Sequence, residues 1–151
     1  PYNVSVTLLL KWLNNIKDFT KLVLILQKEV AERIVAGPNS KEYGYLSVLS
    51  QLLCDVKIEF ELAPEEFFPK PKVYSSAITI IPLPEKRFTV DLKTLCKLMR
   101  IIFTHRRKML RTSLKKMVSN TTAVLEKTQL TGNERPESLT IEQLCLLANN
   151  C

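Results

Sequence analysis

Apolar residues near the start of the chain are spaced as they are in helices. Within residues 5–15 they recur at i, i+3, i+4 and i+7, namely at Val6, Leu9, Leu10 and Leu13. This spacing is typical of one face of an α-helix. A second helical pattern covers residues 28–38 and ends at Gly37 and Pro38. A third follows at residues 46–53.

Three further segments have the pattern of strands. Residues 22–27 form a short continuous apolar run, which is typical of a strand buried on both faces, as in a parallel sheet. Residues 56–63 alternate between apolar and charged side chains and predict a half-exposed strand. The side chains expected to face one way are Val56, Ile58, Phe60 and Leu62. Residues 77–83 are rich in β-branched side chains and predict a further strand that is ended by proline. The order of these elements predicts part of an α/β sheet with an exposed edge.

From Val90 onward the pattern is helical. One apolar stripe comprises Leu92, Leu95, Leu98, Met99 and Ile102, and another comprises Leu110, Leu114, Met117 and Val118. Thr140 and Gln143 have the spacing of a capping box at a helix start. Residues 82–87 read as a linker. The fold class is therefore α/β plus all-α, with the α/β part at residues 1–84 and the helical part at residues 85–151.

The charge of the chain is concentrated in its second half. The net charge is +7 over 151 residues, and residues 88–151 hold eleven Lys or Arg against five Asp or Glu. Between Leu92 and Leu125 there are nine basic residues and no acidic one. This block favours a polyanionic partner such as RNA or DNA. A solvated basic surface, an anionic membrane and an acidic protein are the alternatives.

The composition argues against several kinds of site. No apolar run reaches the roughly 18 residues that span a membrane. The four scattered cysteines are expected to be reduced thiols rather than metal ligands or disulfides, so no metal site is predicted. The three glycines are Gly37, Gly44 and Gly132, and they form no glycine-rich phosphate loop. No cofactor-binding loop is recognisable in these residues.

Five blocks of the sequence, taken in order, resemble the bacterial rRNA adenine N6,N6-dimethyltransferases. The blocks are "PYNVS", "LQKEVAERIVAGPNSKEYGYLSVLSQ", "FFPKPKVYSS", "FTHRRKMLRTSL" and "LTIEQLCLLANN". The resemblance runs along essentially the whole chain. The macrolide-resistance rRNA methylases share the first half and the "PKPKV" loop, and they are the near alternative.

The resemblance implies a Rossmann-like methyltransferase domain followed by a small helical domain that binds rRNA. The family holds S-adenosylmethionine on a glycine-rich loop and an acidic residue in its N-terminal half, and neither is present here. The chain therefore resembles a C-terminal fragment. We expect it to bind no cofactor and to be inactive by itself. The family's catalytic motif reads Asn, Leu or Ile, Pro, Tyr, and this sequence begins at that proline.

The resemblance also assigns roles to individual residues. Pro1 and Tyr2 belong to the catalytic motif, in which the main-chain carbonyl at the proline accepts a hydrogen bond from the target amino group. Tyr2 and Phe67 stack on the two faces of the target adenine. The loop that presents Phe67 is supported by Pro69, Pro71 and Lys72. Phe68 is expected to be a structural neighbour.

Basic residues of the second half are expected to form one stripe along a helix, opposite the apolar stripe. The stripe is expected to contact rRNA phosphates and comprises Arg106, Arg107, Lys108, Arg111, Lys115 and Lys116. His105, the single histidine, is expected to be a surface residue without a catalytic role.

Together these features predict dimethylation of N6 of adjacent adenosines in small-subunit (16S) rRNA, with S-adenosylmethionine as the cofactor of the longer enzyme. The expected partner is the small ribosomal subunit, and the expected location is the cytoplasm. A monomer is expected, with a sheet edge able to pair. The alternatives are a non-catalytic RNA-binding or ribosome-assembly module and a macrolide-resistance type of 23S rRNA methylase.

Overall fold

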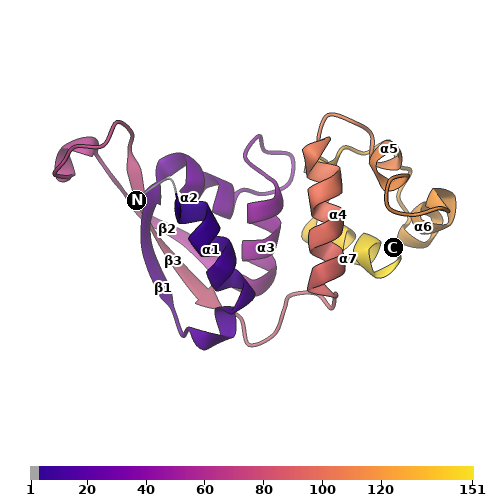
Figure 1. Cartoon of the computed structure of the whole chain (residues 1–151), viewed down its shortest axis with the longest axis horizontal. Helices are drawn as coiled ribbons and strands as arrows, with labels where there is room; N and C mark the ends of the chain where they lie inside the picture. The colour runs from indigo at the N-terminus through magenta and orange to yellow at the C-terminus, as the bar shows by residue number, and fades with distance from the viewer. Residues whose placement is uncertain (1–3) are drawn as a thin grey trace. The chain divides into compact units, whose positions relative to one another are not determined.

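The computed structural model describes residues 4–151 (Figure 1). The chain divides into two compact units. The first comprises Pro1–Ala36 and Leu46–Arg87, and the second comprises Gly37–Tyr45 and Phe88–Cys151. The short segment Gly37–Tyr45 therefore packs with the helices of the second half, although the chain around it belongs to the first unit.

The first unit contains a three-stranded antiparallel sheet with the order β1-β3-β2. Its strands are β1 (Leu22–Gln27), β2 (Cys54–Leu62) and β3 (Ser75–Pro82). The six residues from Ser75 to Ile80 are all buried, because β3 lies in the centre and pairs on both sides. The three strands predicted from the sequence are confirmed, with bounds that differ by two residues or fewer.

The prediction that β1 is buried on both faces, as in a parallel sheet, is wrong. The strand pairs antiparallel to β3, and alternate side chains are exposed, with Val23 at 64% and Ile25 at 51%. Only one face of β1 is covered by the part of the chain that the structure describes. A continuous apolar run predicts burial of a strand on both faces, but it does not say which segments provide the cover.

Strict alternation also fails in β2, where a bulge interrupts the pairing. Ile58 lies opposite Ile78, and Phe60 lies opposite Ala77, so β2 has an extra residue at this point. A bulge turns the following side chains to the other face. Phe60 is therefore 58% exposed instead of lying beside Val56 and Ile58.

Helices complete the first unit: α1 (Ser5–Asn14), the 3₁₀ turn η2 (Ile16–Asp18), α2 (Lys28–Val35) and α3 (Tyr45–Leu53). Leu9 and Leu13 of α1 are fully buried, as the apolar spacing predicts. The free carbonyls at the end of α2 are satisfied by α3, because the Gln51 amide donates to Ile34 O at 3.0 Å and to Ala36 O at 2.8 Å.

The second unit is helical. It comprises α4 (Leu92–Thr104), α5 (Leu110–Leu114), α6 (Thr121–Thr128), the 3₁₀ turn η4 (Pro136–Ser138) and α7 (Ile141–Asn149). The apolar stripe of α4 is fully buried at Leu95, Leu98, Met99 and Ile102. The capping box at the start of α7 is confirmed, because Thr140 Oγ1 accepts from Gln143 N and the Gln143 side chain accepts from Thr140 N.

Tyr43 anchors the segment Gly37–Tyr45 in the second unit. The side chain is fully buried, its hydroxyl donates to Leu139 O at 2.9 Å, and its ring packs edge-on against Phe103 with centroids 6.1 Å apart. Burial raises the pKa of the phenol well above its ordinary value, so the group stays protonated and keeps this hydrogen bond. Among residues 4–151, no helix is long and apolar enough to cross a membrane.

Candidate nucleic-acid interface

The proline-rich loop between β2 and β3 projects from the sheet of the first unit (Figure 1). It begins with the 3₁₀ turn η3 (Pro64–Glu66), and the Phe67 amide closes this turn by donating to Pro64 O at 3.3 Å. Phe67 is half-buried. Its backbone is fixed by the turn, and part of its side chain stays open to solvent.

Phe68 is fully exposed, with a relative accessibility of 102%, so the expectation that it is a structural neighbour is wrong. The chain bends at residues 67–69, and Phe67 itself has extended dihedral angles of φ −123° and ψ 146°. The side chain of Phe67 is half-buried, whereas that of Phe68 lies in solvent.

Ion pairing braces the same loop. Lys70 Nζ pairs with Glu65 across the turn, and the carboxylate pKa of Glu65 is lowered chiefly by this hydrogen bond. Pro69 and Lys72 are exposed, and Pro71 is half-buried. These three residues lie on the same projecting segment as Phe67. Their support of the loop stays a prediction.

The basic residues of the second unit do not lie along a single helix, so the prediction of one helical stripe is wrong. α4 ends at Thr104, and α5 runs only from Leu110 to Leu114. Arg106, Arg107 and Lys108 lie in the turn between these helices. Arg111 is on α5, Lys115 is its C-cap residue, and Lys116 follows it. We call residues 105–116 the basic segment.

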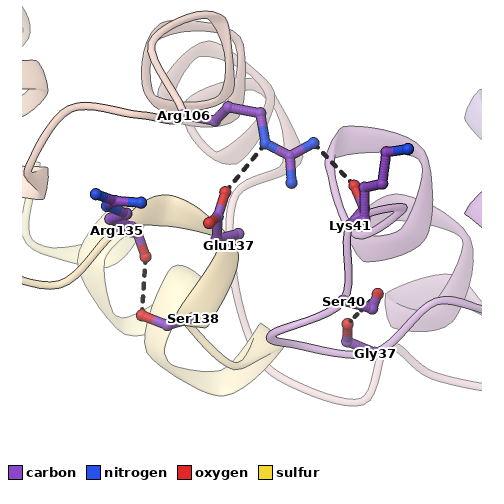
Figure 2. Close-up of polar contacts among 7 residues, drawn as sticks. All are labelled: Gly37, Ser40, Lys41, Arg106, Arg135, Glu137 and Ser138. Carbon is purple, nitrogen blue, oxygen red and sulfur yellow. Dashed lines mark hydrogen bonds and ion pairs between the residues drawn. The ribbon is translucent and has the colours of Figure 1, made fainter.

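Arg106 differs from the other cations of the basic segment because it is half-buried and its guanidinium joins two other segments of the unit (Figure 2). Nε donates to Glu137 Oε2 at 3.0 Å, and Nη1 donates to the carbonyl of Lys41 at 3.0 Å. The Asn39 amide also donates to Glu137 O at 2.8 Å. Arg106 and Glu137 together hold the segment Gly37–Tyr45 against η4.

This role of Arg106 cannot be predicted from the sequence pattern, because its partners are far away in the chain. Glu137 and Lys41 lie 31 and 65 residues from Arg106. No local spacing rule connects positions at such separations. The remaining predicted contacts, Arg107, Lys108, Arg111, Lys115 and Lys116, are exposed, whereas Arg106 is half-buried.

His105 lies at the C-cap of α4, and its ring nitrogen Nε2 is 2.7 Å from Lys116 Nζ. A lysine ammonium can only donate, so this contact requires an unprotonated Nε2 that accepts. His105 thereby links the end of α4 to the residues that follow α5. His105 therefore has a structural role within the basic segment.

Arg111 is held by the loop that follows α6. Its Nη2 donates to Thr131 O at 2.9 Å, and its amide donates to Gly132 O at 3.0 Å. Gly132 has φ of 81°, and a Cβ there would lie 2.6 Å from Leu125 Cδ1 and 3.1 Å from Arg111 Cβ. Only glycine fits at this approach without strain, so the loop is built to lie against Arg111.

None of the glycines forms a cradle for a cofactor. Gly132 packs against Arg111 and Leu125, and a Cβ added at Gly37 or Gly44 would meet no atom within 4 Å. Gly37, Gly44 and Gly132 also lie far apart in the sequence, so the described residues contain no glycine-rich loop.

No metal or reactive thiol site is evident within residues 4–151. No group of three or more His, Cys, Asp or Glu side chains is placed to hold an ion in this range. The four cysteines are free, and burial raises the pKa of Cys54 to about 12, which leaves it as an unreactive thiol. Pro1 and Tyr2, predicted to belong to the catalytic motif, lie outside the described residues.

A model of a known protein family matches the chain over its full length. The model of the family described as "Ribosomal RNA adenine dimethylase" matches residues 1–151. A relative from Wolbachia pipientis subsp. Culex pipiens, "Ribosomal RNA small subunit methyltransferase A", is 67% identical over 150 residues, which cover 99% of this chain and 57% of the relative. The protein of the same name from Ehrlichia canis is 49% identical, with the same shares covered.

Solved structures have the same fold. A dimethyladenosine transferase from Plasmodium falciparum superposes with a TM-score of 0.84 and 25% identity, covering 97% of this chain and 62% of that one. The 23S rRNA methyltransferase ErmE gives a TM-score of 0.67 at 19% identity, with 99% and 62% covered. The predicted fold class is confirmed by these likenesses. The chain spans a little more than half the length of the curated relatives that it matches.

Proposed function

The chain belongs to the ribosomal RNA adenine dimethylase family, and we propose that it supplies the rRNA-binding surface and part of the target-base site of a small-subunit rRNA adenine N6-dimethyltransferase. The observation that carries this proposal is the family match over residues 1–151, together with identities of 67% and 49% to proteins named small subunit methyltransferases. The substrate is 16S rRNA with adjacent adenosines, and the setting is small-subunit maturation in the cytoplasm.

The basic segment is the part of the chain that we propose contacts rRNA phosphates. Its exposed cations are Arg107, Lys108, Arg111, Lys115 and Lys116. Side chains of this kind neutralise phosphates and position RNA without reading its sequence. Arg106, also predicted to contact RNA, supports this surface through Glu137 and Lys41. Its own contact with RNA stays a prediction.

Phe67 is the described residue that we propose stacks on the target adenine. Methyl transfer to a base requires that the base leave its stack, and an extruded base is held by aromatic faces. The turn η3 fixes the backbone before Phe67, and the Lys70–Glu65 pair braces the loop after it. A preorganised ring loses little entropy on binding, which favours stacking. Tyr2 is proposed for the opposite face.

The chemistry of adenine explains why acceptors and aromatic rings suffice. The N6 lone pair is delocalised into the ring, so the amino group is a poor nucleophile. Acceptors aimed at its hydrogens favour a pyramidal nitrogen, and the rest of catalysis is orientation. S-adenosylmethionine supplies the methyl group in the longer enzyme. We propose that residues 1–151 alone bind none of it and transfer no methyl group.

A fluorescent base tests the stacking role. 2-Aminopurine replaces one of two adjacent unpaired adenosines in a small-subunit rRNA hairpin, and quenching on addition of the chain reports stacking. We expect quenching that Phe67→Leu reduces, with a loss of about 1 to 3 kcal/mol in binding. Phe60→Leu removes another half-exposed ring of the same unit, and it is the matched control that keeps the quenching.

Two results would contradict the proposal. Equal quenching by wild-type protein and Phe67→Leu would remove Phe67 from the target site. Equal affinity for a large-subunit rRNA hairpin of the same length would favour the macrolide-resistance type of methylase.

Calorimetry with S-adenosylmethionine at sub-millimolar concentration tests the proposal that residues 1–151 alone bind no cofactor. Stoichiometric binding would disprove it.

A further inference from the structure

A groove between α5 and α6 in the second unit is lined by residues of both helices and of the segment that follows α6. Its volume is about 440 Å³, within the range of roughly 300–1,000 Å³ typical of small-ligand pockets. One wall carries Arg111 and Lys115. The other carries Thr122 and Glu126, which lie one turn apart on α6, and Gln129, the C-cap residue of that helix.

The cationic wall is rigid at Arg111. Its guanidinium donates to Thr131 O, and the tight approach of Gly132 presses the loop against it. The loop itself is closed by Glu134, whose carboxylate accepts from Thr131 N at 2.9 Å and from Gly132 N at 2.7 Å. An arginine already fixed in place loses little freedom when it binds a ligand.

The floor and the second wall have a different chemistry. Leu125 and Leu130 line the groove, and although each is only 9% exposed, they give its floor a small apolar surface. The wall from α6 offers a hydroxyl, a carboxylate and an amide. A site for an inorganic anion alone needs no apolar floor, and the Glu126 carboxylate would repel it. The groove instead suits a ligand with an anionic part, a flat apolar part and an amino group.

We propose that this groove binds one unpaired nucleotide of RNA, with its phosphodiester on Arg111 and Lys115 and its base over Leu125 and Leu130. The inference rests on the proposed function, because it takes rRNA as the ligand of the chain. It adds a specific nucleotide site, separate from the target adenine, to a surface that otherwise holds only phosphates. Nothing in the spacing of the basic residues predicts it.

Glu126 gives the groove a preference among bases. A carboxylate accepts from an exocyclic amino group such as cytosine N4, whereas uracil presents a carbonyl oxygen at the same position. The groove therefore binds an unpaired cytidine more tightly than an unpaired uridine. Gln129 can donate to or accept from the base edge and does not oppose this preference.

Three RNA hairpins of one stem sequence test the site: fully paired, with one bulged cytidine, and with one bulged uridine. Fluorescence anisotropy with the whole chain measures each affinity. We expect the cytidine bulge to bind about fivefold more tightly than the paired hairpin, which corresponds to about 1 kcal/mol from the contacts of one nucleotide in the groove. The uridine bulge should gain less.

Two tryptophan variants separate the groove from the general basic surface. Thr122→Trp fills the groove without changing charge, and we expect it to remove the preference for the cytidine bulge. Thr112→Trp places the same side chain at an exposed threonine of α5 that does not line the groove, and the preference should persist. Glu126→Gln should lose the discrimination between cytidine and uridine bulges. Far-UV circular dichroism checks the fold of each variant.

The outcomes distinguish this inference from the proposed function. Equal affinity of wild-type protein for bulged and paired hairpins overturns the groove site and leaves rRNA binding by the basic segment intact. A preference that survives in folded Thr122→Trp overturns it as well. Absence of binding to every RNA overturns both the groove site and the proposed function.

Discussion

At the scale of single residues, the cations of the basic segment have different tasks. Arg106 is bound to Glu137 and to the Lys41 carbonyl, whereas Arg107 is exposed on the same turn. Two neighbouring arginines of one sequence block therefore differ in what their loss should change. One holds two segments of the unit together, and the other is open to a partner.

Replacing Arg106 should lower stability. Arg106→Ala removes a partly exposed ion pair and a hydrogen bond to a backbone carbonyl, so we expect the free energy of unfolding to fall by about 1 kcal/mol. Urea denaturation measures the change. Arg107→Ala removes the same charge from an exposed position and should stay within about 0.5 kcal/mol of wild type. A larger loss in Arg107→Ala than in Arg106→Ala would contradict this assignment.

Gly132 is the second residue with a specific structural task. Gly132→Ala forces a side chain into φ of 81° and places its Cβ 2.6 Å from Leu125 Cδ1. We expect a loss of about 1 to 3 kcal/mol in the free energy of unfolding, measured by thermal denaturation. Gly37→Ala is the control, because nothing lies within 4 Å of its added Cβ and its φ is ordinary. If both variants melt at the wild-type temperature, the packing described for Gly132 is wrong.

At the scale of elements, side-chain caps define where α4, α6 and α7 begin. Asp91 caps α4, with its carboxylate accepting from Thr94 N and from Thr94 Oγ1, both at 2.8 Å. The bond from the Thr94 amide is the main reason that the pKa of Asp91 is lowered below its ordinary 3.8. The ionised carboxylate is therefore the form that stabilises the helix start.

The lowered pKa of Asp91 gives the stability a pH dependence. A carboxyl with a lower pKa in the folded state contributes fully above 3.8 and loses its contribution as the pH falls through the folded value. Asp91→Asn retains an acceptor but does not titrate. We expect the stability advantage of wild type over Asp91→Asn, from urea midpoints, to shrink below pH 4. An advantage that stays constant from pH 6 to pH 2 would exclude this role.

Element types could be predicted from the sequence where the determinants are local. The capping box at Thr140 and the stripe of α4 specify a helix start and a buried face within a few residues. The bulge at Phe60 could not be predicted, because it depends on pairing with β3. The open face of β1 likewise depends on which distant segments cover it.

The break between α4 and α5 is indicated in the sequence by the end of the apolar stripe of α4. Positions three and four after Ile102 are His105 and Arg106, so the stripe has no apolar residue on the next turn. The helix ends there, and Arg106 turns toward Glu137 instead. The identities of the exposed cations were thus predictable, but their arrangement was not.

At the scale of the whole chain, the segment Gly37–Tyr45 is the notable feature of the division into two units. It connects α2 to α3 in sequence, yet it packs with the helical unit through Tyr43 and Arg106. The linker predicted at residues 82–87 does not indicate that Gly37–Tyr45 belongs to the second unit. Each unit therefore includes chain from both sides of the predicted boundary.

The central claim is that the basic segment of this chain binds small-subunit rRNA. Its most direct test is the affinity for a 16S rRNA fragment as a function of salt, for wild type and for the double variant Arg107→Ala/Lys108→Ala. Each phosphate contact adds roughly −0.7 to −0.9 to the slope of log K against log salt, so we expect a steep slope that becomes shallower by roughly 1.4 to 1.8 in the double variant. A slope that is flat, or the same in both proteins, would contradict the claim.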